Sequence, residues 1–312
     1  MDDEITQIAD QLEDQASPGR GRGGGSSSRG RGGGRGGRFR TNKGGKGREV
    51  DLSRALSRLL RHQAANAGVE LDREGFASLD KVLQWGAVRS LQATFAEIVS
   101  AVRDSDKQRF ALKPNPATNK GLDEASTDPA HWLIRANQGH SIKLDNEGLL
   151  KPLALPFAED GTLPEGSVAV PATVVHGTYY AFWPRIVASG GLRPMGRNHV
   201  HFSTGLPEDE AGVVSGMRRD AELLIYVDVA ASMREAGIKW WMSDNGVVLT
   251  EGAEEGLVPA KYFREVAGRT QGVGVLWRDG EAVADLPAGI TIRVPQGKAR
   301  AGGGRGGRGG KA

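Results

Sequence analysis

The chain has 312 residues, enough for one large domain or two of ordinary size, and it contains no cysteine, which excludes disulfides, thiolate zinc sites and a cysteine nucleophile. Its formal net charge of +3 conceals an acidic body between basic ends, because residues 49–296 hold 26 Lys and Arg against 32 Asp and Glu. A nucleic-acid site within that body must therefore come from local placement of basic side chains, not from bulk charge.

The two ends of the chain, residues 1–48 and 297–312, are predicted to be disordered. Residues 17–48 follow an acidic start and are rich in Gly and Arg, as are residues 297–312, and such sequences cannot bury apolar area. RGG segments of this kind either hold RNA, through phosphate attraction and Arg stacking, or only keep a chain in solution. The start lacks a signal core and no run of about 18 apolar residues occurs, so we expect a cytoplasmic and/or nuclear protein without membrane contact.

A first folded lobe is predicted over residues 49–149. Three segments have helical periodicity, LSRALSRLLRHQAANAG, SLDKVLQWGAV and TFAEIVSAVRDSD, and two are typical of strands, RFALK and HWLIRA. The first helix should bury one stripe of leucines and turn its arginines the other way: Leu52, Leu56, Leu59 and Leu60 against Arg54, Arg58 and Arg61. Ser78 is the expected N-cap of the second helix, and Gly68 should end the first. Three helices and a β-ribbon indicate a winged-helix-like arrangement.

A second lobe is predicted over residues 166–296, after a linker at 150–165 that is rich in Pro, Gly and acidic residues. Its expected strands are VVHGT, HVHFS, ELLIYVDV, GIKWWMS and GVVLTEG, and its expected helices are residues 179–190 and AASMREAG. Many strands and few helices favour an α+β sheet lobe. The polar stretch 105–130, with two prolines, is interpreted as an insertion loop.

Arg61 and His62 stand together near the end of the first predicted helix. Arginine offers a planar fork for phosphate, and histidine can exchange a proton near neutral pH. The pair fits a phosphate site for that reason. It fits a solvated helix face as well, because Arg54 and Arg58 share that face.

The segment IRANQGHSI follows a predicted strand and gathers polar side chains around Gly139, namely Arg135, Asn137, Gln138, His140 and Ser141. A glycine turn that collects hydrogen-bond donors suits an anion or a ribose. A polar hairpin turn whose side chains satisfy one another would have the same sequence.

Three further groups lie in the second lobe. His176, Gly177 and Thr178 end a strand, where glycine would let a ligand approach the backbone; a buried histidine capping a turn is the alternative. In RNHVHFS, alternate residues share one strand face, and with no acidic partner at metal spacing we expect no metal there. In SGMRRD, two arginines precede a long apolar strand. The residues on that face of RNHVHFS are Arg197, His199, His201 and Ser203, and the arginines of SGMRRD are Arg218 and Arg219.

Taken in order, LSRALSRLLRH, IRANQGHS, HGT, RNHVHF, SGMR and NGVVLTEG resemble the signature of the NAD-dependent tRNA 2′-phosphotransferase family over about residues 50–266. Each motif alone is weak, and six in the right order are strong. The resemblance implies an α+β enzyme with a winged-helix-like first lobe and an ADP-ribosyltransferase-like second lobe. It implies that the splice-junction 2′-phosphate of tRNA, or of another RNA, is transferred to NAD⁺, which is consumed as a co-substrate.

The resemblance also implies the site. The family's catalytic Arg-His-Arg-Arg set maps onto Arg61, His62, Arg135 and Arg218, and the NAD⁺ pocket would draw on Gln138, His140, Ser141, His176, Gly177, Thr178, Arg197 and His199. The implied reaction has two steps: the RNA 2′-phosphate displaces nicotinamide from NAD⁺, and the adjacent ribose hydroxyl then attacks phosphorus. The second step releases 2′-hydroxyl RNA and ADP-ribose 1″,2″-cyclic phosphate.

Two other functions stay open at this stage. An ADP-ribosyltransferase acting on nucleic-acid ends would stop after the first step, and a non-enzymatic RNA-binding protein would need neither step. The products distinguish all three. We expect a monomer that requires no metal.

Overall fold

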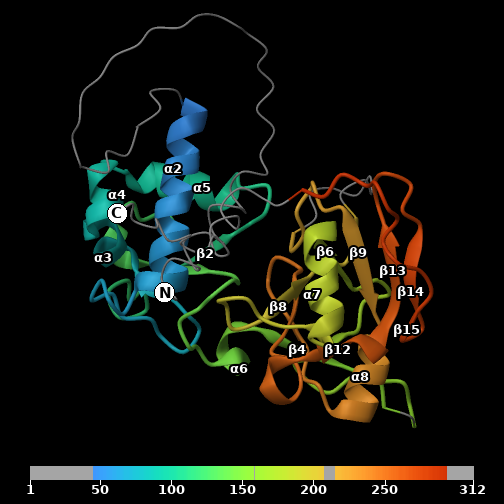
Figure 1. The fold of residues 1–312 in the computed structure, drawn as a ribbon. Coiled ribbons are helices and arrows are strands. Elements are labelled where there is room, and N and C mark those ends of the chain that lie inside the picture. The colour runs from blue at the N-terminus through green and yellow to red at the C-terminus, as the bar shows by residue number, and fades with distance from the viewer. Residues whose placement is uncertain (1–44, 158, 207–214, 294–312) are drawn as a thin grey trace, which may run out of the picture.

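The computed structural model describes residues 45–157, 159–206 and 215–293. The tails predicted to be disordered therefore lie outside the described residues, except for Gly45 to Arg48, which begin the first helix. Figure 1 shows a lobe of helices with a small sheet beside a lobe built mainly of strands. This arrangement confirms the predicted α+β class.

The first lobe packs its helices on a three-stranded antiparallel sheet. The helices are α2 (Gly45–Arg58), continued by a π-helical turn η1 (Leu59–Gln63), then α3 (Leu79–Gln84), α4 (Gly86–Ser90) and α5 (Phe95–Arg103). The strands are β1 (Ala77–Ser78), β2 (Phe110–Pro114) and β3 (Trp132–Ala136), in the order β1-β3-β2. The predicted leucine stripe of the first helix is buried as expected, with Leu52, Leu56, Leu59 and Leu60 in the core of this lobe.

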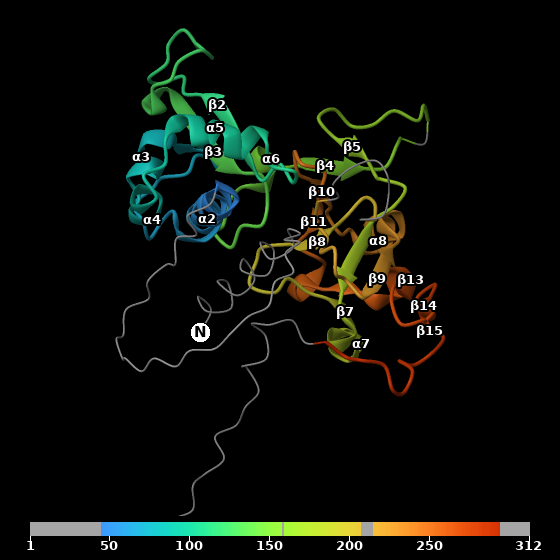
Figure 2. The same cartoon turned by 90° about the horizontal axis from the view of Figure 1, so that it is seen from above.

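Three local features differ from the prediction. The second helix is two short helices, because Trp85 takes an extended conformation between α3 and α4. Ser78 stands at the N-cap of α3, but its hydroxyl donates to Asp80 instead of accepting from the helix backbone. The ribbon gains the third strand β1, which pairs with β3 through Ala77 and Ile134. Between β2 and the 3₁₀ turn η2 (Pro129–His131), a loop projects from the lobe (Figure 2).

The second lobe contains two five-stranded sheets with a core between them. One has the order β5-β4-β10-β11-β8 and the other β15-β14-β13-β9-β6, and a bridge between Val175 and Ser203 joins β6 to β8. The strands are β4 (Lys151–Ala154), β5 (Val168–Ala169), β6 (Val175–Thr178), β8 (Val200–Phe202), β9 (Leu223–Val227), β10 (Trp241–Met242), β11 (Val248–Thr250), β13 (Phe263–Gly268), β14 (Val275–Arg278) and β15 (Glu281–Ala282). Residues of both sheets, including Phe202 and Ile225, form one buried cluster.

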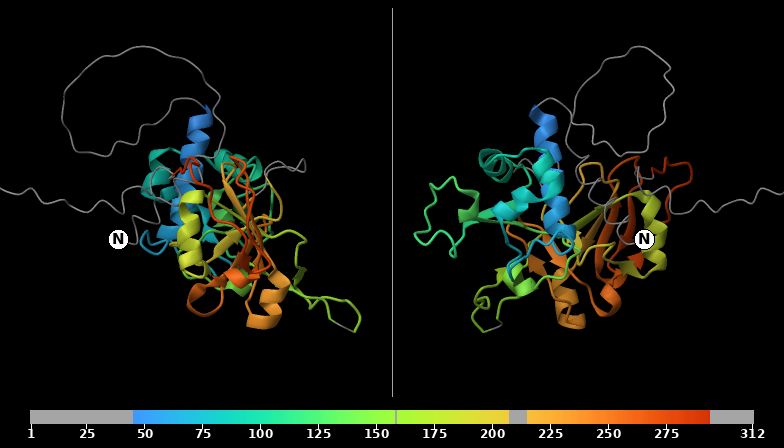
Figure 3. Two further views of the ribbon diagram at one scale, coloured as in Figure 1. Left: turned by 45° about the vertical axis from the view of Figure 1, so that its right-hand side comes forward. Right: turned by 90° about the vertical axis from the view of Figure 1, so that its left-hand side faces the viewer.

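Short helices accompany these sheets. They are α6 (Asn146–Leu149), η3 (Tyr180–Phe182), α7 (Trp183–Ala188), α8 (Val229–Ala236), η4 (Glu254–Gly256) and η5 (Ala260–Tyr262), and β7 (Gly191–Leu192) pairs with β12 (Val258–Pro259). In Figure 3, α8 (orange) lies below the ends of the strands and α7 (yellow-green) runs alongside them. Helices were expected at the positions of α7 and α8. In the described part of the chain, no helix is both long and apolar enough to cross a bilayer.

The stretch 150–165, predicted as a linker, is only partly one. Its residues Lys151–Ala154 form β4, which pairs with β10 on one side and with β5 on the other. The proline and the short length of this segment masked its strand character. The strands β13 to β15 also lacked a predicted counterpart.

Candidate active site

The first helix ends in the π-helical turn η1, and this turn buries Arg61. The side chain of Arg61 is 2% exposed, although the helical periodicity placed it with Arg54 on a polar face. A π turn contains more residues than an α turn, so residues in and after it rotate relative to the α-helical pattern. The solvated-face interpretation is therefore wrong for Arg61, while Arg54 stays exposed as that pattern predicted.

The turn from Gln138 to Ser141 docks on the end of this helix. The backbone N–H of Ser141 donates to the carbonyl oxygen of Arg61 at 3.0 Å, and the Ser141 hydroxyl lies 2.8 Å from Nδ1 of His62. Gly139 has a φ of +90°, and a Cβ there would lie 3.4 Å from the guanidinium carbon of Arg61. The glycine therefore serves a close approach to Arg61 as well as a left-handed turn.

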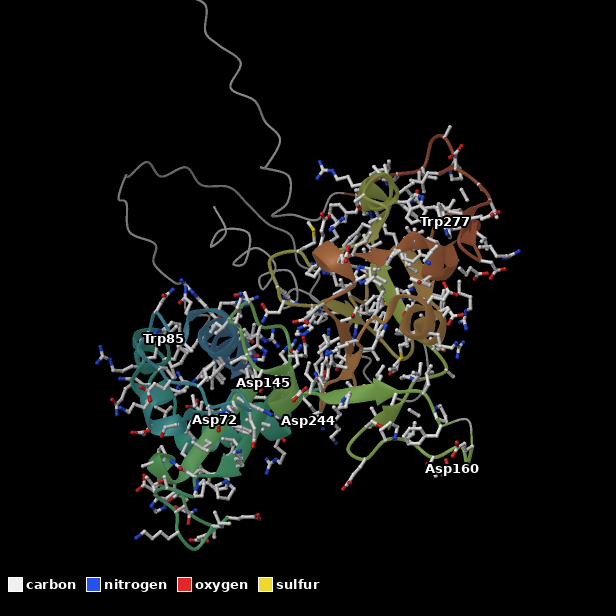
Figure 4. All side chains as sticks on the ribbon, turned by 90° about the horizontal axis from the view of Figure 1, so that it is seen from below. Asp72, Trp85, Asp145, Asp160, Asp244 and Trp277 are labelled. Atoms are coloured by element: carbon white, nitrogen blue, oxygen red, sulfur yellow. The ribbon has the colours of Figure 1, made fainter. Side chains whose placement is uncertain are left out.

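Arg135 reaches the same region from strand β3. Its Nη1 donates to the carbonyl oxygen of Glu74 at 2.9 Å, and its guanidinium lies over the ring of Phe76, 4.7 Å from the centroid. Its Nη2 donates to Oδ2 of Asp244 at 2.5 Å. Asp244 belongs to the second lobe and lies where the two lobes meet (Figure 4). The pair thus fixes a first-lobe arginine against a second-lobe carboxylate.

His140 marks the centre of the cationic region. Burial, together with the nearby charges of four basic side chains, lowers the pKa of His140 to about 3. Those side chains are Arg61, His62, His199 and Arg135. Mutual repulsion of this kind requires the five groups to be close together. The fold therefore gathers these basic side chains in one region, where Asp244 pairs with Arg135 and Glu251 lies near His199.

The loop before β8 is tied to the same turn. The backbone N–H of Asn198 donates to the carbonyl oxygen of His140 at 2.9 Å, and its side-chain amide donates to that of Ile142 at 2.7 Å. His199 is buried, which lowers its pKa, and Glu251 at 3.9 Å acts in the opposite direction. Arg197 precedes this pair and is half-buried.

The β6 strand joins this network through its histidine. Nδ1 of His176 donates to the carbonyl oxygen of His201 at 2.9 Å. At Gly177 a Cβ would lie 2.4 Å from Cγ of Met217, so glycine makes room for the SGMR segment; the expected approach of a ligand there stays a prediction. Thr178, which follows, is buried.

Arg218 is tied to the end of this strand. Its Nη1 donates to the hydroxyl of Tyr179 at 3.3 Å, and its guanidinium lies 5.5 Å from the centroid of that ring. The hydroxyl of Ser215, in the same segment, donates to the carbonyl oxygen of Lys107 in the first lobe at 3.3 Å. The structure thus brings Arg61, His62 and Arg135 to the Gln138–Ser141 turn, and holds Arg218 at Tyr179.

Several buried polar atoms at this site lack a hydrogen-bond partner among the described residues, and they include Oδ1 of Asn137, Oε1 of Gln138 and Nε2 of His140 and His199. Buried polar groups in proteins are nearly always hydrogen-bonded, so atoms of this kind are suited to a polar ligand. In residues 45–157, 159–206 and 215–293, no group of three or more His, Asp or Glu side chains is arranged to hold a metal ion.

Asp244 and Asn198 were missed by the sequence analysis. Asp244 stands in SDNG, a run typical of an exposed turn, and nothing local indicates its partner in the other lobe. The Asn in RNH could have been noticed, because it lies within a motif that was singled out.

We expect Asp244→Ala to destabilise the protein by about 1–2 kcal/mol, because it leaves the Arg135 guanidinium between the lobes without its carboxylate partner. The cost is below the roughly 3–5 kcal/mol of a fully buried pair, since the Asp244 side chain is 41% exposed. Denaturant unfolding of the variant and of the unmodified protein measures this difference in the free energy of unfolding. Glu235→Ala is the matched control, because its pair with Lys261 is exposed on both sides and should contribute little. Equal losses in the two variants would contradict a structural role for the Arg135 pair.

We also expect stability to fall as the pH drops from about 6.5 toward 3, in part through His140. The pKa of His140 is lowered in the folded state. Between about pH 6.5 and 3, His140 therefore binds a proton in the unfolded chain and stays neutral in the folded one. Each such group contributes a slope of up to about 1.4 kcal/mol per pH unit. His140→Gln should therefore flatten the plot of unfolding free energy against pH by about one proton. Parallel plots for the two proteins would show that His140 titrates normally.

Comparison with known proteins gives a consistent result. Residues 47–252 match the family described as RNA 2′-phosphotransferase, Tpt1 / KptA family. The chain is 41% identical over 219 residues to tRNA 2′-phosphotransferase 1 of Bos taurus, covering 70% of this chain and 75% of that protein. It is 33% identical over 219 residues to tRNA 2′-phosphotransferase of Saccharomyces cerevisiae, covering 70% and 84%. It is 34% identical over 220 residues to a probable RNA 2′-phosphotransferase of Rhizobium johnstonii, covering 70% and 96%.

Proposed function

The chain belongs to the RNA 2′-phosphotransferase family, Tpt1 / KptA, and on that premise we propose that it transfers the splice-junction 2′-phosphate of tRNA to NAD⁺. The enzyme is a transferase of RNA processing. In the family's reaction the products are 2′-hydroxyl RNA, nicotinamide and ADP-ribose 1″,2″-cyclic phosphate. We further propose that the first lobe is winged-helix-like and that the second is ADP-ribosyltransferase-like.

One observation carries this proposal: the first helix and the β3 strand bring two buried arginines to a turn that also contacts His62. A phosphate monoester and NAD⁺ are both anionic, so binding them together requires cations that offset their repulsion. Arg61 and Arg135 have the planar fork that suits phosphate oxygens. Asp244 holds Arg135 in place, and Gly139 lets the turn approach Arg61.

Each residue then has a proposed task. Arg61, Arg135 and Arg218 bind the 2′-phosphate and offset the charge that develops on phosphorus. His62, next to the Ser141 hydroxyl, gives a proton to the departing RNA 2′-oxygen. The pocket for NAD⁺ uses Gln138, His140, Ser141, His176, Gly177, Thr178, Arg197 and His199. The unpartnered atoms of Gln138, His140 and His199 support this assignment, because the ribose hydroxyls and the amide of NAD⁺ can donate to or accept from them.

The test is incubation of a 2′-phosphorylated RNA with the protein and NAD⁺, followed by separation of the products. We expect 2′-hydroxyl RNA, nicotinamide and the cyclic phosphate in equal amounts. Release of nicotinamide with retention of ADP-ribose on the RNA would instead indicate an ADP-ribosyltransferase of nucleic-acid ends. Unchanged NAD⁺ would indicate a protein that only binds RNA.

A further inference from the structure

A cavity of about 480 Å³ lies at the edge of the second lobe, where β9 begins and β13 ends. Three arginines line it: Arg219 before β9, Arg269 after β13, and Arg293 near the end of the described chain. Arg219 directly follows Arg218, so the cavity adjoins the arginine held at Tyr179. The proposed reaction does not use these three side chains.

Hydrogen bonds hold the Arg269 side chain and the segment that carries Arg293. Nη1 of Arg269 donates to the carbonyl oxygens of Arg219 at 2.6 Å and Ala221 at 3.1 Å. The segment that carries Arg293 is fixed by two hydrogen bonds between the Gln271 side chain and the backbone of Thr291, of 2.9 and 2.7 Å. These contacts fix the position of the Arg269 guanidinium and the backbone of the segment that carries Arg293.

Two acidic residues, Asp220 and Glu222, also line the cavity, and each accepts a hydrogen bond from a neutral group. Oδ1 of Asp220 accepts from the hydroxyl of Tyr179 at 2.9 Å. Oε2 of Glu222, which is buried, accepts from the backbone N–H of Tyr180 at 3.3 Å. Among the described residues, the side chains of Arg219 and Arg293 form no ion pair, and both are exposed. Two guanidinium groups are thus available to an anion from solution.

A second cavity on the same sheet provides a contrast. It measures about 370 Å³ and is lined by Tyr226, Arg264, Glu265, Arg278 and Asp279. There Arg278 donates to Glu265 at 3.3 Å, and Arg264 lies over the Tyr226 ring at 5.9 Å. In this second cavity Arg278 and Arg264 contact an acidic and an aromatic side chain, whereas Arg219 and Arg293 of the first cavity form no ion pair among the described residues.

We propose that the cavity lined by Arg219, Arg269 and Arg293 binds a phosphodiester of the RNA strand that carries the 2′-phosphate. This inference rests on the proposed function, and it adds a contact away from the reacting group. Contacts to backbone phosphates fix the register of a strand on a protein without reading its sequence, and Arg is well suited to them. Arg219 lies within the family match, whereas Arg269 and Arg293 lie beyond residue 252 and outside it.

The test compares two substrates, a 2′-phosphorylated dinucleotide and a longer RNA with the same 2′-phosphorylated junction. In the double variant Arg219→Ala/Arg293→Ala, we expect the KM for the longer RNA to rise about tenfold or more, since each removed phosphate contact weakens binding. The KM for the dinucleotide and both kcat values should stay unchanged. The slope of log KM against log salt for the longer RNA should fall by about one unit per arginine.

Arg264→Ala, in the other cavity, is the matched control and should change neither substrate's KM. The proposal is overturned if the double variant leaves the KM of the longer RNA unchanged, or raises the KM of the dinucleotide equally. A raised KM for NAD⁺ also overturns it, and would assign the cavity to the diphosphate of NAD⁺. Inactivity of the unmodified protein on both RNAs would refute the proposed function instead, so the two failures are distinguishable. Both arginines are exposed, and an unchanged melting temperature would confirm that the variant folds.

Discussion

His62→Ala is expected to slow the release of 2′-hydroxyl RNA by about 10²–10⁴-fold, the usual contribution of a positioned proton donor. The second step must expel an RNA 2′-oxygen, which is a poor leaving group unless it receives a proton. The first step expels nicotinamide, which needs no proton. His62 should therefore affect the second step more than the first. Its ring is fixed by the contact between Nδ1 and the Ser141 hydroxyl.

Single-turnover reaction with a labelled 2′-phosphorylated RNA measures the two steps separately. In His62→Ala, ADP-ribosylated RNA should accumulate before the final product forms. His131→Ala is a matched control, because Nδ1 of His131 also lies 2.8 Å from a serine hydroxyl, that of Ser126. His131 belongs to η2, which lies outside the site. That variant should react as the unmodified protein does. If turnover collapses in His62→Ala while no intermediate accumulates, His62 does not act in the second step.

Arg135→Lys is expected to lower kcat/KM by about ten- to a hundredfold, although the charge is preserved. Each hydrogen bond to a charged group contributes about 1.5–3 kcal/mol, and about 1.4 kcal/mol corresponds to a factor of ten. The guanidinium of Arg135 bonds Glu74 and Asp244 through different nitrogens while it stacks on Phe76. An ammonium group cannot reproduce this fork, so it cannot hold the same position and also present a flat face to phosphate.

Steady-state kinetics with varied RNA and NAD⁺ measure this effect. Lys113→Ala serves as the control, because Lys113 lies over the same Phe76 ring, 4.1 Å from its centroid, on the neighbouring strand β2. The Lys113→Ala variant loses packing on Phe76 but no proposed phosphate contact. It should therefore leave kcat/KM nearly unchanged. Full activity of Arg135→Lys would remove Arg135 from the phosphate site.

The helices and most strands could be predicted because their patterns are local. The leucines from Leu52 to Leu60 repeat at helical spacing and are buried. In β8, Val200 and Phe202 lie in the core while His201 does not, as alternation along a strand requires. The strands β13 to β15 were missed because Arg264, Glu265 and Arg278 interrupt their apolar pattern on the exposed face of the outer sheet.

The sequence by itself determined the family and the residue types of the site, because the six motifs occur in order and each is readable in its own segment. Only the tertiary structure decided where those residues lie and what they contact. The π-helical turn buries Arg61, and a hydrogen-bonded contact brings His62 to Ser141, 79 positions later in the chain. The ion pair of Arg135 with Asp244 spans 109 positions. The identity of a side chain is the same whether it faces water or a distant partner, so a one-dimensional pattern cannot reveal such pairs. They arise when the chain packs, within the first lobe for His62 and Ser141 and between the lobes for Arg135 and Asp244.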